Sequence, residues 1–351
     1  MSTLTAAGAI PADTRVMTAR RVFLTALAVN SALTLFCAVS YFTGFGASLV
    51  GSVTLDLQTA LRIGSNILII TVLWGFIWLG IKALLLAKFA KFTREERRAA
   101  FGSRMREPFD VADLVARHSE RRIRIVDMIG RRGRFITLAM AGFFYLYSRV
   151  AGDPSPNFAT LFLQDNLFDA VVTSWIFLAF YYSNGFLAAA FYGPQSRVMD
   201  GVLARANCLL ITTLWTVFKF VMVPLGAQLA AVFRPDEFAV VFALIWGSYI
   251  VTDASSEIGG ALFGKQTLRV WGIGDVNRKS IGGTVSGLGT AFVFCLWIVL
   301  AHGLPAPWIA LAIVIALSST ALELFSPRGT DDFTMATTNA LICWAFGTLI
   351  R

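Results

Sequence analysis

Residues 253–284 read DASSEIGGALFGK (253–265), QTLRVWGIGDVN (266–277) and RKSIGGT (278–284). The stretch begins with two carboxylates inside an apolar segment, passes through a basic, glycine-rich loop and enters a second apolar segment. Charged side chains inside a membrane helix are costly and usually mark a functional site. We therefore expect this stretch to join two membrane helices and to carry much of the chemistry of the protein.

The composition of the whole chain is that of a membrane protein. Of its 351 residues 56% are hydrophobic and 15% are charged, and the mean hydropathy is +0.68. Several apolar runs reach the roughly 20 residues that a membrane helix needs, which predicts an all-α polytopic membrane protein. The net charge of +9 is typical of cytoplasmic loops that face anionic inner-leaflet lipids, and we expect no nucleic-acid partner.

The apolar runs predict nine membrane helices. Residues 88–134 hold fourteen Lys and Arg against seven Asp and Glu, so this loop and the N-terminus are expected in the cytoplasm. The nine helices are expected near residues 22–45, 63–87, 135–151, 167–192, 207–233, 238–263, 283–302, 308–325 and 333–350. The chain then divides into an N-terminal segment, two helices, the basic loop, a lipid-binding part and a catalytic part (1–21, 22–87, 88–134, 135–235 and 236–351).

Part of the basic loop has the pattern of an amphipathic helix. Its apolar residues recur at helical spacing, while most of its arginines lie on other faces. Such a helix is expected either to lie on the anionic inner leaflet or to act as a solvated linker. The apolar residues are Val111, Leu114, Val115, Ile125, Val126 and Ile129.

Asp253 and Glu257 are four residues apart and therefore share one face of the predicted sixth helix. Two carboxylates at that depth repel each other unless a metal ion, a lysine or a proton neutralises them. The alternative is that one carboxyl group is protonated, or is paired with another helix for packing.

Further carboxylates lie near the cytoplasmic ends of the last two helices. Asp331 and Asp332, taken alone, fit the capping of a helix N-terminus. Taken together with the intramembrane pair and Glu323, they form a set of oxygen ligands, and such a set without His or Cys suits Mg²⁺ and hence phosphate substrates. The candidate metal ligands are Asp253, Glu257, Glu323, Asp331 and Asp332.

The start of the predicted seventh helix has the features of an anion site. Arg278 and Lys279 precede Ser280, Gly283 and Thr284, and free N–H groups beside cations bind anions. The alternative is that these cations only follow the excess of positive charge in cytoplasmic loops.

The string GGALFGK, which ends at Lys265, is close to a P-loop. We reject that interpretation because Gln266 replaces the Ser or Thr and because the string ends a membrane helix. Lys219, near the middle of the fifth helix, is expected to pair with Asp253, with a buried phosphate or with a structural partner. Asn184 is a weaker polar candidate.

Roughly the last hundred residues resemble the polyprenol kinase family, which includes dolichol, phytol and farnesol kinases and is related to phosphatidate cytidylyltransferase. The chain departs from the family pattern at Gly282, where the family has Glu, and at Phe333, where it has Asn. The matching positions are Asp253, Gly260, Phe263, Gly264 and Lys265, then Lys279, Ser280, Gly283 and Thr284, then Glu323, Gly329, Asp331 and Asp332.

The resemblance implies a kinase of a membrane-embedded isoprenoid or other lipid alcohol, with CTP or another nucleoside triphosphate as donor. It implies Mg²⁺ among Asp253, Asp331 and Asp332, and phosphates held by Arg278 and Lys279 with help from Lys265. A bacterial inner membrane is expected, or an organelle membrane, and the oligomeric state stays open.

Two alternatives remain at this point. One is a cytidylyltransferase that acts on a lipid phosphate, although the C-terminal signature of those enzymes is absent. The other is an ion-coupled transporter or lipid-binding protein in which Lys219, Asp253 and Glu257 form a pathway.

Overall fold

The computed structural model describes residues 12–43, 74–102, 111–130, 170–183, 185–270, 277–327 and 329–350. Nearly all of this part of the chain is helical, which confirms the expected all-α class. The elements are α1 (Ala12–Thr43), α4 (Trp74–Lys88), α5 (Arg94–Gly102), α6 (Val111–Arg117), α7 (Glu120–Gly130), α10 (Phe186–Tyr192), η2 (Val198–Leu203), α11 (Ala204–Val232), α12 (Pro235–Phe242), η3 (Ala243–Gly247), α13 (Ser248–Phe263), β1 (Thr267–Val270), β2 (Asn277–Ser280), α14 (Ile281–Ala301), α15 (Ala306–Phe325) and α16 (Asp331–Leu349).

Three of the described helices are long and apolar enough to cross a membrane: α1, α14 and α15. The two parts of α11, which bends by 43° next to Pro224, make a fourth if they form one span. A proline inside a helix removes a hydrogen bond and explains such a bend. The chain is therefore membrane-embedded. The expected third helix (135–151) and the first half of the second lie outside the described residues.

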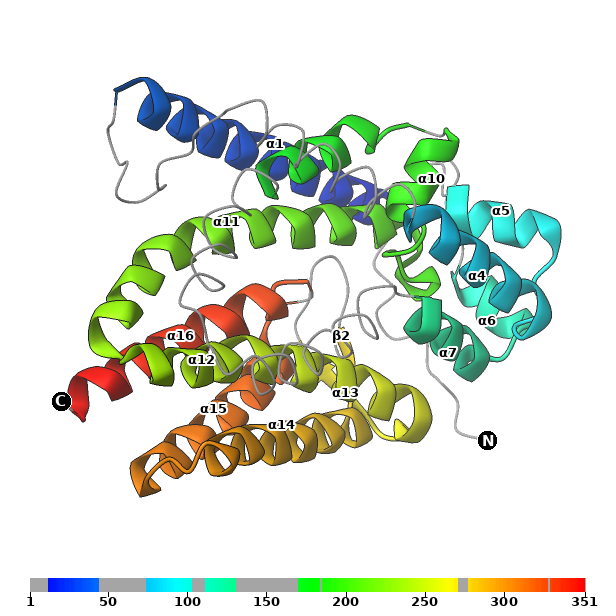
Figure 1. Ribbon diagram of the computed structural model, residues 1–351. Coiled ribbons are helices and arrows are strands. Elements are labelled where there is room, and N and C mark those ends of the chain that lie inside the picture. Colours follow the sequence, from blue (N-terminus) through cyan, green and yellow to red (C-terminus); the bar gives the residue numbers. More distant parts are fainter. Residues whose placement is uncertain are drawn as a thin grey trace.

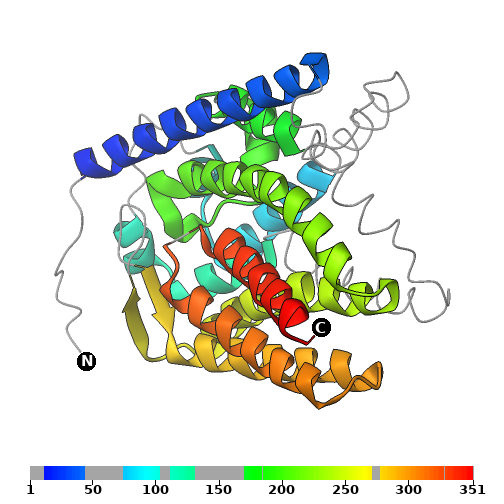
Figure 2. The ribbon, with the colours of Figure 1, turned by 90° about the vertical axis from the view of Figure 1, so that its left-hand side faces the viewer.

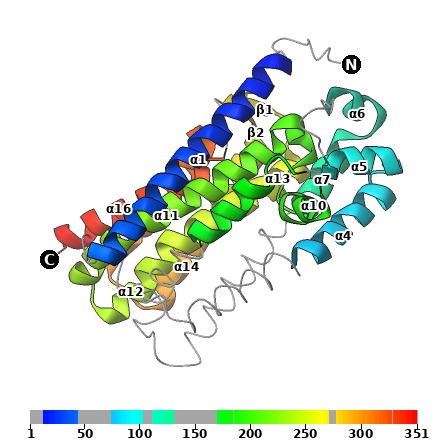
Figure 3. The same ribbon diagram turned by 90° about the horizontal axis from the view of Figure 1, so that it is seen from above.

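The helices α13 to α16 form a bundle against which α11 packs (Figure 1). Its core is apolar, and α1 lies along α11 when the molecule is seen from above (Figure 3). The core includes Trp308, Ala312 and Ile315 of α15 and Met335 and Cys343 of α16, all at most 2% exposed.

Glycines bring α13 and α14 into backbone contact. A Cβ atom on Gly283 would lie 2.6 Å from the carbonyl oxygen of Ser256, and one on Gly287 would lie 2.1 Å from the Ser256 hydroxyl. Small residues at a helix interface allow this close approach. By contrast, Gly289 has no atom within 4 Å of its Cβ position.

The expected fourth membrane helix (167–192) is wrong as one continuous element. The described part is helical from Ala170 to Phe180, turns at residues 181–183, and resumes as α10. The guanidinium of Arg205 donates hydrogen bonds of 2.8 and 2.6 Å to the carbonyl oxygens of Tyr181 and Ser183. The break is thus stabilised because the carbonyl groups that it releases find a charged donor. Asn184 lies outside the described residues.

The predicted amphipathic helix is divided into two short helices, α6 and α7, and a further short helix, α5, precedes them in the basic loop. Leu114 of α6 and Ile123 and Val126 of α7 are buried in one cluster with Leu86 of α4. The apolar face of the predicted amphipathic helix therefore packs on the protein, and contact of its outer face with anionic lipid stays a prediction.

A β-hairpin, which the sequence did not predict, joins α13 to α14 (Figure 2). Strands β1 and β2 pair in antiparallel fashion, with Leu268 opposite Lys279. Strand β2 leads directly into α14, and the register of the hairpin fixes where Lys279 lies relative to β1, which follows α13.

Replacement of Gly283 by Ala is expected to lower the free energy of unfolding by about 1–3 kcal/mol, because the added methyl group forces α13 and α14 apart. The measurement is denaturation of the purified protein in detergent. Gly289→Ala in the same helix is the control, and we expect a neutral effect or a gain of up to ~1 kcal/mol. Equal effects of the two substitutions would contradict the glycine contact.

Candidate functional site

Three carboxylates from three helices converge at one end of the bundle. Asp253 of α13, Glu323 of α15 and Asp331 of α16 each place one oxygen within 4.8 Å of the others. Glu323 lies in the last turn of α15 and Asp331 is the first residue of α16, so the loop between these helices brings the two together. Asp253 and Glu323 are buried, at 8% and 3% exposure. We call these three residues the carboxylate cluster.

Lys279 of β2 supplies a cation to this cluster. Its ammonium nitrogen lies 2.5 Å from Oε1 of Glu323 and 3.6 Å from Oδ2 of Asp331. The other oxygen of Glu323, Oε2, is buried and has no hydrogen-bond partner in the described part of the chain. A buried carboxylate oxygen without a partner is costly, so this atom is suited to a further donor or cation.

The other two predicted metal ligands lie outside the carboxylate cluster. Glu257, one turn after Asp253, forms an ion pair with Arg197 at 3.2 Å between Oε1 and Nη2. Asp332 is half-buried in the first turn of α16, beside Asp331. The structure thus selects three of the five candidate carboxylates as a group.

The predicted anion site adjoins the cluster through Lys279. The next residue, Ser280, caps α14, because its hydroxyl oxygen accepts the N–H of Gly283 at 3.1 Å. The Thr284 hydroxyl donates to the carbonyl oxygen of Ser280 at 3.2 Å. Lys265 is exposed after the end of α13, and the Arg278 side chain lies outside the described part.

Lys219 is 2% exposed, and its ammonium lies against two indole rings that also contact each other. Its ammonium nitrogen is 5.2 Å from the ring centre of Trp215 and 5.3 Å from that of Trp246 in η3. A desolvated cation on aromatic faces is stabilised by their quadrupoles. This environment supports a structural role for Lys219 in joining α11 to the bundle.

A second polar layer, which sequence reasoning missed, lies within the same three helices. The amide nitrogen of Asn339 (α16) donates to the hydroxyl oxygens of Ser248 (α13) at 2.9 Å and Ser319 (α15) at 2.8 Å. All three residues are fully buried. Hydrogen bonds between packed helices restrict their relative rotation, so this layer orients the helices that carry the carboxylates. The signal in the sequence was an Asn inside an apolar run.

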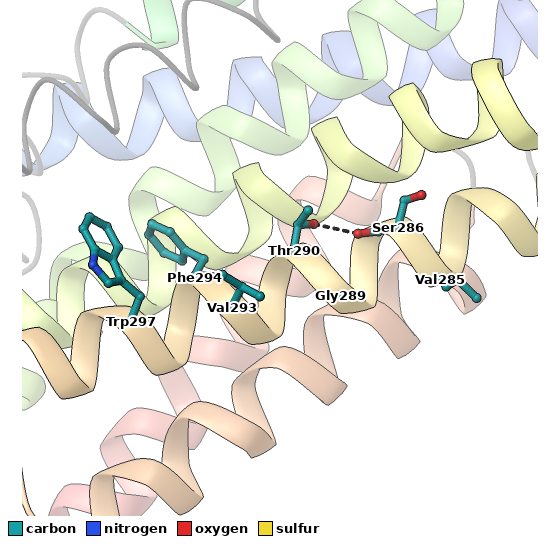
Figure 4. Close-up of a pocket in the computed structure, with 7 residues that line it drawn as sticks. All are labelled: Val285, Ser286, Gly289, Thr290, Val293, Phe294 and Trp297. Atoms are coloured by element: carbon teal, nitrogen blue, oxygen red, sulfur yellow. Dashed lines mark hydrogen bonds between the residues drawn. The ribbon is translucent and has the colours of Figure 1, made fainter.

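A shallow groove follows the outer face of α14 (Figure 4). None of the cluster residues lines it. Its exposed apolar side chains are those expected of a span that faces lipid hydrocarbon. The groove is lined by Val285, Ser286, Gly289, Thr290, Val293, Phe294 and Trp297.

In comparisons with known proteins, the chain matches no family model, no curated protein and no solved structure. The function must therefore be argued from the site itself.

Replacement of Lys279 by Met is expected to destabilise the protein by about 3 kcal/mol, because it leaves buried carboxylates without their cation. The double variant Lys279→Met/Glu323→Gln should recover part of this loss, since one of the repelling charges is gone. A double-mutant cycle of unfolding free energies in detergent measures the coupling, which we expect at about 1–3 kcal/mol. Strictly additive losses would rule out the proposed pairing.

Proposed function

We propose that this protein is a kinase that transfers the terminal phosphate of a nucleoside triphosphate, CTP by the resemblance described above, to a membrane-embedded lipid alcohol. The observation that carries the proposal is the carboxylate cluster, two members of which, Glu323 and Asp331, pair with Lys279 just before α14. Metal ligands and a phosphate-binding cation side by side are the parts that phosphoryl transfer requires.

The carboxylate cluster fits Mg²⁺. The ion prefers oxygen ligands, and Asp253, Glu323 and Asp331 offer carboxylate oxygens only. The buried and unpartnered Oε2 of Glu323 supports this assignment. When bound there, Mg²⁺ would neutralise charge on the phosphate oxygens of the nucleotide.

Lys279 joins the two parts of the proposed site. It is the residue before the N-cap of α14, yet its ammonium reaches the carboxylate cluster. Without a nucleotide the side chain neutralises Glu323 and Asp331. With a nucleotide bound, we propose that the ammonium holds a phosphate oxygen, while the first turn of α14 provides N–H groups and a favourable dipole.

The reaction needs one proton acceptor. The lipid alcohol oxygen forms a bond to the terminal phosphorus, the bond from that phosphorus to the nucleoside diphosphate breaks, and the alcohol proton passes to the carboxylate of Asp253. Asp253 suits this role because it is nearly buried and lies deeper along α13 than Glu257. A lipid hydroxyl would reach such a depth from the bilayer.

The membrane arrangement that we propose has nine spans, of which the fourth is broken at residues 181–183, with a cytoplasmic N-terminus and the site at the cytoplasmic face of a bacterial inner membrane. The basic loop of residues 88–134 supports this orientation. In this arrangement, the exposed Arg121 and Arg122 of α7 face the anionic headgroups.

Purified protein with labelled CTP, Mg²⁺ and a panel of lipid acceptors, namely prenols, diacylglycerol, a prenyl phosphate and phosphatidate, is expected to yield a phosphorylated lipid alcohol and CDP. Release of pyrophosphate instead would identify a cytidylyltransferase. No transfer to any lipid by a folded sample would reject both activities.

Two adjacent substitutions test the site most sharply. Asp331→Asn removes a member of the carboxylate cluster and should lower kcat by about 100-fold or more, as should Asp253→Asn. Asp332→Asn changes the neighbouring acid outside the cluster and should retain most of the activity. Equal losses at residues 331 and 332 would show that the cluster is not the reacting centre.

A further inference from the structure

The segment between α10 and η2 approaches the candidate site through Arg197. Its guanidinium is paired with Glu257, which lies one turn, or about 6 Å along the helix axis, after Asp253 on the same face of α13. The Arg197 side chain is 29% exposed and that of Glu257 is 15% exposed. A cation from outside the last four helices thus pairs with the carboxylate that lies one turn after Asp253.

Two buried charges hold the backbone on both sides of Arg197. Before it, the ammonium of Lys82 (α4) donates to the carbonyl oxygens of Gly193, at 3.1 Å, and Ser196. Lys82 is only 1% exposed. The segment immediately before Arg197 is therefore fixed to α4.

After Arg197, the second buried charge, Asp127, holds the backbone. The carboxylate of Asp127 (α7) accepts the N–H groups of Val198 at 2.8 Å and Met199 at 3.1 Å. Asp127 also lies 3.7 Å from the Lys82 ammonium. One buried ion pair thus positions the chain immediately before and immediately after Arg197.

A buried ion pair that fixes the backbone on both sides of Arg197 is not required for an ordinary ion pair at a protein surface. Burying two charges has a large desolvation cost, and exposed Arg–Glu pairs contribute little to stability. A guanidinium held in place at Glu257, one helical turn from Asp253 of the carboxylate cluster, is however suited to a phosphate ligand. Its planar fork binds two phosphate oxygens at once, and a fixed backbone lowers the entropy lost on binding.

We propose that Arg197 binds phosphate in the candidate site and that Glu257 holds it in place when no ligand is bound. This inference rests on the proposed function and adds a residue to it from outside the catalytic part. The ligand is a phosphate group, carried either by the nucleoside triphosphate or by the phosphorylated lipid. Lys82 and Asp127 are positioning residues that act through Arg197.

The test measures binding of CTP with Mg²⁺, and separately of a prenyl monophosphate, to the full-length protein in detergent. Arg197→Gln should weaken binding by about tenfold or more, and Arg197→Lys should weaken it less. Glu257→Gln should leave binding equal or tighter, because it releases Arg197. Arg234→Gln is the matched control, since Arg234 forms a similar pair with Glu237 in another part of the chain, at 3.1 Å.

The positioning role has its own readout. Asp127→Asn should weaken phosphate binding in the wild-type background but add little to the loss in Arg197→Gln, whereas a purely structural effect would add fully. The ligand whose binding is weakened by Arg197→Gln, CTP or the prenyl monophosphate, is the one whose phosphate Arg197 binds.

Three outcomes would overturn the proposal. Unchanged binding of both ligands by Arg197→Gln, with an unchanged melting temperature, overturns it and leaves the proposed kinase intact. Equal losses in Arg197→Gln and Glu257→Gln show a merely structural pair. Failure of the wild-type protein to bind either ligand overturns this inference together with the proposed function.

Discussion

The ammonium of Lys279 among buried carboxylates is the interaction on which the rest of this structure depends. Glu323 and Asp331 come from different helices and would repel each other without it. The position of Lys279 depends on the register of the β-hairpin. The distance of Lys279 from α13 depends on the glycine contact at Gly283. Secondary structure, helix packing and charge are therefore coupled at one residue.

A second layer deeper in the bundle explains how three helices hold this arrangement. Asn339 ties Ser248 and Ser319 together on the helices that carry the carboxylates. Apolar packing between membrane helices leaves rotation weakly specified, whereas directional hydrogen bonds specify it. The bundle thus has a charged layer at its end and a neutral polar layer in its interior.

The sequence predicted the helices where apolar runs are long and uninterrupted, as at α14 and α15, and it predicted the carboxylates because charge is rare in such runs. It could not group them, because Asp331 and Asp332 are equivalent in sequence and only the helix geometry separates them. The break before α10 was missed because it depends on a distant residue, Arg205. The sequence did not distinguish Arg197 from the other cations of the loops, because its pairing with Glu257 depends on the tertiary structure.

The backbone contact between α13 and α14 determines whether a hydrocarbon chain can pass between these two helices. With Gly283 against the Ser256 carbonyl and Gly287 against its hydroxyl, these two helices leave no seam that a hydrocarbon chain could enter. They form a closed wall on one side of the carboxylates. Under the proposed function, a lipid that reaches the carboxylates from the bilayer is therefore expected to pass a different pair of helices.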